Sequence, residues 1–280
     1  MNRILHKAEL APNIYEMIVE SPLVAAKAEA GHFVIVMADE RGERIPLTVA
    51  DYDREKGTIT LVLMTIGTST MKLAALQAGD SLHALIGPLG HASELADFGT
   101  VVMVAGGVGT APIYPIARRL HEMGNRVISV QGARTKDLLF WTEKLAAVSD
   151  EHIITTDDGS FGRKGLVTEP LKEQLERDDA KRIGCVYAIG PVIMMKFCAK
   201  TTEPFGVKTV VSLNTIMIDG TGMCGGCRVG IAGKTMFTCV DGPEFDGHAV
   251  DWDQLLSRQR VYVDHEKCSL DKYMKDTAKS

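Results

Sequence analysis

The amino-acid sequence predicts a β barrel joined to an α/β domain of the doubly wound, parallel-sheet type, with a small cysteine-rich domain at the C-terminus. Three observations support this prediction. Short apolar runs broken by Gly, Pro and Asp fill the first third of the chain, and the middle alternates such runs with helical stretches. Three of the six cysteines lie close together, at positions 224, 227 and 239. A length of 280 residues suits two or three modest domains.

The composition is that of an ordinary globular protein, with 45% hydrophobic and 24% charged residues. The formal net charge of -5 and the lack of a long basic run argue against nucleic acid as a partner, because phosphate binding needs clustered Lys and Arg. No apolar run approaches the roughly 20 residues that a membrane helix needs. Lys7 and Glu9 interrupt the apolar pattern of a signal peptide. We therefore expect a cytoplasmic protein that contacts no membrane.

Residues 1–97 are predicted to form the barrel. The runs His32–Ala38, Thr58–Met64 and Ser81–Ile86 are apolar and closely spaced, with no long helical pattern between them. Such a series of short strands is typical of a small barrel or sandwich.

Two stretches of this first part offer the groups that a flavin needs, namely a hydroxyl near its N5, an apolar surface against its ring and donors for its pyrophosphate. One stretch contains Arg44, Pro46, Leu47 and Thr48, and the other contains Gly67, Thr68 and Thr70. Without other evidence, the first stretch is equally compatible with an ordinary surface strand, and the second with an ordinary Gly-Thr-Ser turn.

Residues 98–210 are predicted to form the α/β domain. The expected strands are Val101–Ala105, Arg126–Val130, His152–Thr156, Cys185–Ile189 and Thr209–Leu213. The expected helices between them are Pro112–Met123, Lys136–Val148, Leu166–Arg177 and Val192–Thr201. Strands that alternate with helices indicate a parallel sheet covered on both faces.

A glycine-rich turn follows the first strand of this domain. Gly106, Gly107, Gly109 and Thr110 stand between the strand and a helix that has Pro112 in its first turn. Glycines at this place let a pyrophosphate approach the backbone, and the helix N-terminus offers free N–H groups. The pattern differs from the usual G-x-G-x-x-G, and a tight structural turn uses similar residues. Its position at the head of the α/β domain favours a nucleotide site.

Two further loops follow later strands of the same sheet, where open α/β sheets bind their ligands. Asp157 begins one of them, and Gly190 and Pro191 form the other. Either loop alone is also compatible with an ordinary turn.

Residues 211–280 contain the cysteine cluster. The loop runs from Asp219 to Cys224 and Cys227, and then to Cys239. Its D-x4-C-x2-C-x11-C spacing is that of a plant-type [2Fe-2S] loop with Asp in the first position. The interspersed glycines let the backbone wrap closely and direct amides at sulfide. Three Cys and one Asp also suit a tetrahedral zinc ion, although zinc ribbons usually pair two C-x2-C units and this chain has one.

The other cysteines are predicted to bind no metal. Cys185 lies in an expected buried strand and Cys198 on a helix, where cysteine behaves as a small hydrophobe. Cys268 is a lone thiol in a polar tail. If Asp219 is only a solvated loop residue, Cys268 or another side chain is the alternative fourth ligand. In that tail Trp252–Arg260 is expected to form a short helix.

Taken together, these motifs resemble the ferredoxin reductase-like superfamily over essentially the whole chain. The resemblance is closer to two families within it: the electron-transfer subunits of bacterial dihydroorotate dehydrogenase, and the small subunits of NADH-dependent reduced ferredoxin:NADP oxidoreductase, also known as sulfide dehydrogenase subunits. It implies FAD in the barrel, NAD(H) on the α/β domain and a [2Fe-2S] cluster near a subunit interface. Thr48 and Leu47 would then lie by the flavin, Gly67 and Thr70 by its pyrophosphate.

The resemblance also implies a function: electrons pass between NAD(H), FAD and the cluster, with no catalytic side chain. In the second family the partner is a larger subunit with its own FAD and [4Fe-4S] clusters, which handles NADPH and ferredoxin by electron bifurcation. Asp219 in place of a first Cys favours that family. The wider superfamily has the pattern R-x-Y-[ST], with Arg three residues before the hydroxyl residue. In this chain Ile45 stands at that position, and Arg44 precedes it by one. The alternatives are a dihydroorotate dehydrogenase electron-transfer subunit, a self-sufficient NADH:acceptor reductase and a zinc-stabilised nucleotide-binding regulator.

Overall fold

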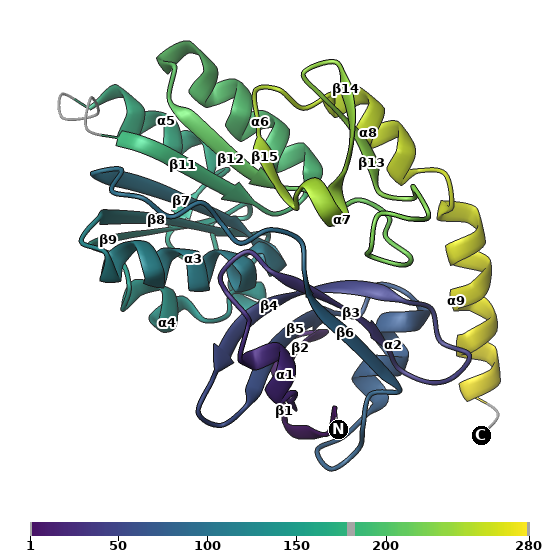
Figure 1. The fold of residues 1–280 in the computed structure, drawn as a ribbon. Helices are drawn as coiled ribbons and strands as arrows, with labels where there is room; N and C mark the ends of the chain where they lie inside the picture. Colours follow the sequence, from purple (N-terminus) through teal and green to yellow (C-terminus); the bar gives the residue numbers. More distant parts are fainter. Residues whose placement is uncertain (1, 178–182, 279–280) are drawn as a thin grey trace.

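The computed structural model describes residues 2–177 and 183–278. Figure 1 shows an N-terminal barrel below an α/β layer, with the C-terminal residues covering one side of both. No helix among the described residues is long and apolar enough to cross a membrane.

The barrel is one antiparallel sheet of six strands in the order β1-β2-β5-β4-β3-β6. The strands are β1 (Ile4–Ala11), β2 (Ile14–Glu20), β3 (Phe33–Met37), β4 (Ile45–Asp53), β5 (Thr58–Met64) and β6 (Ala84–Leu89). Arg3 pairs with Ser81, just before β6, so the last strand returns to the first. Two short helices, α1 (Pro22–Ala25) and α2 (Thr68–Ala75), accompany the sheet. Alternate side chains fill the interior, for example Val34 and Val36 of β3.

The α/β domain is a seven-stranded sheet in the order β10-β9-β8-β7-β11-β12-β15. Its strands are β7 (Thr100–Gly106), β8 (Arg126–Ala133), β9 (Glu151–Thr156), β10 (Arg163–Lys164), β11 (Ile183–Ile189), β12 (Lys208–Ser212) and β15 (Glu244–Asp246). All neighbours are parallel except β12 and β15. The order confirms the predicted doubly wound sheet, because the chain runs outward from β7 in one direction and then from β11 in the other.

Helices cover both faces of this sheet, as Figure 1 shows. They are α3 (Thr110–Glu122), α4 (Thr142–Ala146), α5 (Thr168–Glu176) and α6 (Val192–Thr202), with 3-10 turns at Gly107–Gly109, Lys136–Leu138 and Glu203–Phe205. Val102 and Val104 of β7 pack with α5 and α6, whereas Val101 and Met103 pack with α3. This alternation is the period of two that a buried strand requires.

One expected helix is much shorter than the sequence predicts. The prediction was a helix over Lys136–Val148, but only the turn Lys136–Leu138 and α4 are helical. Between them Trp141 has a φ of 52°, in the left-handed region. This bend buries Phe140 beside Ala50 and Ala111, so tertiary packing of the two aromatic residues outweighs the local helical preference.

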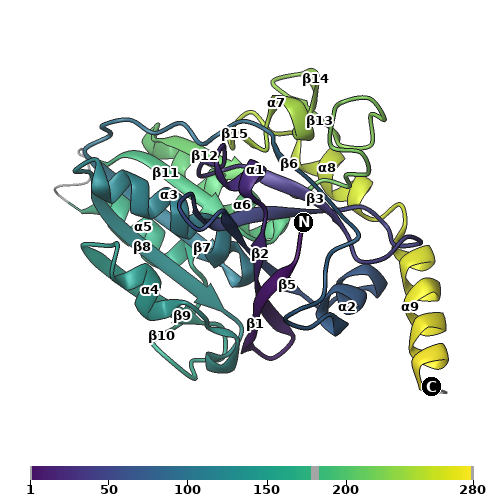
Figure 2. The ribbon, with the colours of Figure 1, turned by 60° about the horizontal axis from the view of Figure 1, so that its bottom comes forward.

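The C-terminal residues form a hairpin and three helices. The hairpin pairs β13 (Arg228–Ile231) with β14 (Lys234–Phe237), and α7 (Thr238–Asp241), α8 (Trp252–Gln259) and α9 (Val263–Thr277) follow. The predicted helix at 252–260 is confirmed in α8. The sequence did not predict α9, which has no buried residue of its own and lies alongside α2 of the barrel (Figure 2).

Candidate functional site: a cysteine loop between a barrel and a nucleotide-binding sheet

The four predicted cluster ligands form two pairs. The Sγ atoms of Cys227 and Cys239 are 3.2 Å apart, and the backbone N–H of Cys224 donates to Asp219 Oδ2 at 2.9 Å. No three Cys, His, Asp or Glu side chains of residues 2–177 and 183–278 converge as ligands of a single metal ion. The first pair is a contact between two thiols, and the second joins the Asp219 carboxylate to the Cys224 backbone. Two pairs of residues match a two-iron cluster, in which each iron takes two protein ligands besides the bridging sulfides. The donor set therefore fits a [2Fe-2S] cluster.

The backbone of this loop already directs amides at sulfur. Gly226 N lies 3.5 Å from Cys224 Sγ, and Cys239 N lies 3.5 Å from Cys227 Sγ. Gly220 and Gly222 have positive φ angles of 79° and 86°. A Cβ at Gly220 would approach Ile35 Cγ1 to 2.8 Å, so glycine is required both for the turn and for the contact with the barrel.

The electrostatics differ between the two pairs of predicted ligands. Hydrogen bonds from the hydroxyl and N–H of Thr221, and from the Cys224 N–H, lower the pKa of Asp219 to about 2. Burial and the neighbouring Cys227 thiol raise the pKa of Cys239 to about 12. Asp219 is thus an anion at neutral pH, whereas the Cys239 thiol would have to lose its proton to bind a metal ion.

The cysteine loop packs directly on the barrel. Cys227 and Cys239 share an apolar cluster with Phe33 and Ile35 of β3, to which Met217 also belongs. In the β3–β4 ladder Phe33 lies opposite Thr48, and Ile35 lies opposite Pro46. Residues directly opposite in an antiparallel pair lie on the same face of the sheet. The structure therefore brings Thr48 and Pro46 to the face of the barrel that carries the cysteine loop.

The other two residues predicted beside them are placed differently. Leu47 packs against the interior core of the barrel, on the opposite face from Thr48. Arg44 is exposed immediately before β4. Leu47 could therefore contact a ligand on the outer face only through its backbone.

Gly67, Thr68 and Thr70 lie together at the start of α2. Gly67 is the N-cap residue, with open space where a Cβ would be. Thr70 Oγ1 accepts the N–H groups of Ile66 and Gly67, both at 3.1 Å, and so stabilises the start of the helix. The Thr68 hydroxyl lies 3.1 Å from that of Ser269 in α9. The C-terminal helix is therefore anchored beside this turn.

The glycine-rich turn lies at the switch point of the α/β sheet. It follows β7, and the loop of Gly190 and Pro191 follows the adjacent strand β11. A Cβ at Gly109 would come within 2.0 Å of the Ile189 carbonyl oxygen, and one at Gly190 within 3.1 Å of the Gly106 Cα. The two loops thus touch, and only glycines allow it. Thr110 begins α3, so the N-terminus of this helix lies at the switch point, where such sheets bind nucleotides.

Asp157 lies farther along the same edge of the sheet. It follows β9, two strands from β7, and its N–H donates to the carbonyl oxygen of Ala133 at 3.1 Å. The structure does not bring Asp157 together with the glycine-rich turn. The backbone of Asp157 lies beside the end of β8, where Ala133 is followed by Arg134.

Sequence reasoning missed Gln131, at the end of β8. Its buried amide donates to Phe140 O at 2.8 Å and to Thr110 Oγ1 at 3.3 Å, and its Oε1 has no hydrogen-bond partner among the described residues. The signal was available, because Gln131 is a long polar side chain that ends an apolar strand. Its amide fixes the position of Thr110 at the start of α3.

An ion cluster joins the barrel to the nucleotide-binding sheet. Asp51 of β4 accepts from Arg118 of α3 at 2.7 Å and from Lys144 of α4 at 3.1 Å. Lys144 Nζ also lies 3.8 Å from the centroid of the Trp141 ring. These partly buried contacts hold the two domains at a fixed angle. Sequence alone could not find them, because the partners are distant in the chain.

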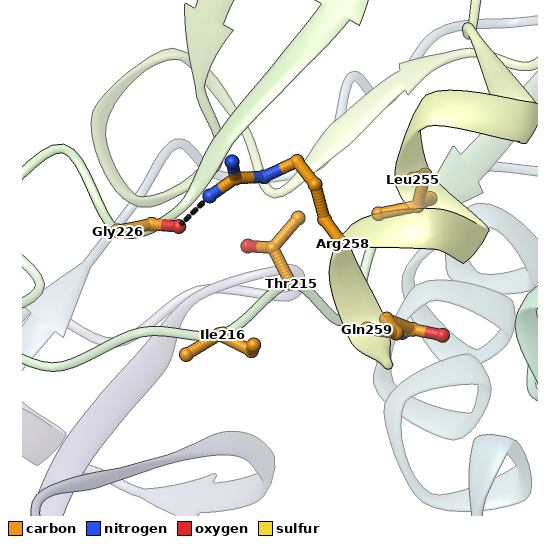
Figure 3. Close-up of a pocket in the computed structure, with 6 residues that line it drawn as sticks. All are labelled: Thr215, Ile216, Gly226, Leu255, Arg258 and Gln259. Carbon is orange, nitrogen blue, oxygen red and sulfur yellow. Dashed lines mark hydrogen bonds between the residues drawn. The ribbon is translucent and has the colours of Figure 1, made fainter. Parts of the chain in front are cut away.

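A small cavity lies behind the cysteine loop, between it and α8 (Figure 3). Its volume is about 10 Å³, which suits one water molecule, and Thr215 Oγ1 at its wall has no hydrogen-bond partner among the described residues. Arg258 of α8 donates across it to Gly226 O at 2.9 Å, and Gln259 donates to Asn214 O at 3.0 Å. The end of α8 therefore fixes both arms of the loop.

The remaining cysteines behave as the sequence predicts for core thiols. Cys185 and Cys198 are fully buried, and burial raises the pKa of each to about 12. Cys268 is exposed on α9.

Comparison with known proteins agrees with this geometry. Residues 103–200 match an oxidoreductase NAD-binding domain, and residues 214–251 match the iron–sulfur cluster binding domain of dihydroorotate dehydrogenase B. The second match favours iron–sulfur chemistry over the zinc alternative.

Two relatives span most of the chain. The chain is 45% identical to the Thermotoga maritima homologue of the dihydroorotate dehydrogenase B (NAD(+)) electron transfer subunit, over 100% of this chain and 98% of the relative. It is 32% identical to the electron transfer subunit of Bacillus cereus strain Q1, over 86% and 94%.

Two solved structures share the fold. A structure of NADH-dependent reduced ferredoxin-NADP oxidoreductase, described in connection with flavin-based electron bifurcation, has 44% identity and a TM-score of 0.91, covering 98% of each chain. Phthalate dioxygenase reductase, at 17% identity and a TM-score of 0.59 over 89% and 96%, shows the common fold. The predicted ferredoxin reductase-like architecture is thus confirmed, and the chain belongs to the family of dihydroorotate dehydrogenase B electron transfer subunits and their homologues.

Proposed function

We propose that this chain is the NAD(H)-, FAD- and [2Fe-2S]-binding subunit of an electron-bifurcating NADH-dependent ferredoxin:NADP oxidoreductase. The observation that carries the proposal is the packing of Cys227 and Cys239 on Phe33 and Ile35, the strand neighbours of Thr48 and Pro46. A bound flavin accepts two electrons as hydride and releases them singly to a one-electron centre. The chain's own task is to hold the two nucleotides and the cluster at short range.

Each part of the chain has a proposed role. Residues 1–97 hold FAD, with Thr48 and Pro46 at the ring and the start of α2 at the pyrophosphate. Residues 98–210 hold NAD(H) between the turn at 106–110 and Gly190. Residues 211–280 hold the cluster, through Asp219, Cys224, Cys227 and Cys239. The ion cluster at Asp51 holds the barrel against the α/β domain. No side chain acts as a general acid or base.

The proposed partner is a larger cytoplasmic subunit with its own flavin and [4Fe-4S] clusters, which acts on NADPH and ferredoxin. The match to a bifurcating oxidoreductase structure over 98% of the chain supports this choice. Asp219 supports it too, since the four-Cys pattern typical of the dihydroorotate subunits has Cys there. The second candidate is a dihydroorotate dehydrogenase electron-transfer subunit, favoured by the family match at residues 214–251.

Metal, sulfide and flavin analysis of the purified full chain tests the proposal. We expect about one FAD, two iron and two acid-labile sulfide per chain. Stoichiometric zinc without sulfide would overturn it. Purification of the native complex then separates the two candidates, since a [4Fe-4S] flavoprotein partner supports the first and an FMN barrel enzyme supports the second.

A further inference from the structure

Two arginines hold the peptide carbonyls that lie between two of the proposed ligands. In the turn from Cys224 to Cys227, Arg228 Nη1 donates to Gly225 O at 3.0 Å. Arg258 Nη2 donates to Gly226 O at 2.9 Å, as Figure 3 shows. The Gly225 carbonyl shares its peptide with the Gly226 N–H, which is directed at Cys224 Sγ. The Gly226 carbonyl shares its peptide with Cys227, so the bond from Arg258 holds the peptide that leads into that proposed ligand.

The two arginines differ in how firmly they are held. Arg258 lies in the last turn of α8, a helix anchored by the buried side chains of Trp252 and Leu255 and capped by Asp251, which accepts from Gln254 N at 2.9 Å. Its guanidinium crosses the small cavity beside Thr215 and is partly buried. Arg228 is exposed at the start of β13. Solvent and salt therefore screen Arg228 more strongly than Arg258.

The charge of Arg258 is also uncompensated. Within the described ranges it forms no ion pair with a carboxylate, in contrast to Arg118, which is paired with Asp51. A fixed, partly buried cation with no counter-ion exerts a larger potential on its neighbours than an exposed one. The turn that Arg258 holds carries the proposed ligands Cys224 and Cys227 at its two ends.

We propose that Arg258 is a positioning residue that raises the reduction potential of the [2Fe-2S] cluster, through its charge and its hydrogen bond to the Gly226 carbonyl. A reduced cluster carries one more negative charge than an oxidised one, so a nearby cation favours reduction. Charge and hydrogen bonding around the sulfurs are recognised determinants of such potentials. This inference rests on the proposed function, because it requires the cluster in the loop 219–239.

An EPR-monitored redox titration of the purified full chain tests the proposal. Arg258→Gln removes the charge and the forked donor, and we expect its equilibrium constant for cluster reduction to fall about tenfold, which is about 59 mV for one electron. Arg258→Lys retains the charge, and we expect it to stay within about threefold of the wild type. Arg260→Gln is the matched control, since it removes the same charge from an exposed residue two positions along the chain. We expect it to change the constant less than twofold.

Two results would overturn the inference while leaving the proposed function intact. One is a wild-type potential in Arg258→Gln with full iron and sulfide. The other is an equal shift in Arg258→Gln and Arg260→Gln, which would mean a general charge effect. If Arg258→Gln assembles no cluster, the potential of Arg258→Lys tests the inference instead. A tenfold fall in its equilibrium constant for cluster reduction would contradict the role of the charge. A wild-type chain that contains no iron would instead refute the proposed function itself.

Discussion

Asp219 is the residue that most clearly distinguishes this chain from a four-cysteine relative. The sequence placed it at the first ligand position, and the structure shows its carboxylate held by Thr221 and by the N–H of Cys224. Those bonds keep it ionised and close to the next ligand. What the sequence could not predict is Arg258, whose contact with Gly226 joins residues 32 positions apart. No sequence pattern around Arg258 or Gly226 indicates that the two residues are in contact.

Substitution of Asp219 tests its role as an iron ligand. We expect Asp219→Ala to lose most of its iron and sulfide but to keep its FAD, because the barrel is a separate unit. Asp219→Cys should keep the cluster as an all-thiolate site with altered visible and EPR spectra, since thiolate is a softer donor than carboxylate. Asp253→Ala, which removes an exposed carboxylate of the same region, is the control. If Asp219→Ala keeps the cluster content of the wild type, Asp219 is not an iron ligand.

Glu244 gives a second residue-level prediction, on stability. Enclosure of its carboxyl raises the pKa to about 7, partly offset by the hydrogen bond from Ser93 at 2.7 Å and reinforced by Glu94. A carboxyl with a raised folded-state pKa destabilises the folded state progressively as pH rises from about 4.5 to about 7, and fully above it. Glu244→Gln should therefore stabilise the protein at pH 8 by about 2–4 kcal/mol more than at pH 4.5. A melting-temperature difference between variant and wild type that is equal at both pH values would contradict this.

At the scale of elements, periodicity found most strands and helices but failed where tertiary contacts decide. The barrel strands at 33–37 and 58–64 and the strands of the parallel sheet were predictable, because their apolar runs are bounded by turn residues. The helix expected over 136–148 was wrong, since burial of Phe140 and Trp141 bends the chain. The helix α9 was missed, because it buries no apolar stripe and its contact with α2 is invisible in the sequence.

The contact between the loops after β7 and β11 can be tested at Gly109. Its backbone is helical, with a φ of -59°, so alanine is tolerated locally, but a Cβ would lie 2.0 Å from the Ile189 carbonyl oxygen. We expect Gly109→Ala to force these loops apart and to weaken NADH binding at least about tenfold, or about 1.4 kcal/mol. FAD and cluster content should not change.

Gly124→Ala, just after the far end of α3, is the control for that experiment. No atom lies within 4 Å of a Cβ there, and the positive φ of 89° costs only about 1–2 kcal/mol of backbone strain. NADH affinity is measured by the change in flavin absorbance on titration. Equal affinities for Gly109→Ala and the wild type would contradict the proposed NAD(H) site between the turn at 106–110 and Gly190.

At the scale of the whole molecule, the three parts meet at one place. The barrel contributes β3 and β4, the cysteine loop packs on β3, and the helix α3 of the nucleotide sheet packs on β4. The sequence predicted each part and its order along the chain. It could not predict that β15, which follows the cysteines, returns to pair with β12. That return fixes the cysteine loop relative to the nucleotide sheet.

The residues at the ends of β8 and β9 predict a preference for NADH over NADPH. Arg134 and Lys136 at the end of β8 are exposed, but Asp157 and Asp158 follow β9 alongside them, and hydrogen bonds from Ser160 lower the pKa of Asp158. Carboxylates at this edge of the sheet would repel the 2′-phosphate of NADPH. We expect NADH to reduce the flavin at least about tenfold more efficiently than NADPH, and Asp157→Asn to narrow that ratio. More efficient reduction by NADPH in stopped-flow measurements would refute the assignment to NAD(H).

The central claim is that electrons pass within this single chain from NADH through a flavin to the cluster of the loop 219–239. Anaerobic mixing of the purified chain with NADH, followed by freezing and EPR spectroscopy, tests it most directly. The packing of the cysteine loop on β3 predicts the signal of a reduced [2Fe-2S] cluster at close to one electron per cluster. Flavin that bleaches with NADH while the cluster of the same sample, reducible by dithionite, stays oxidised would contradict the claim.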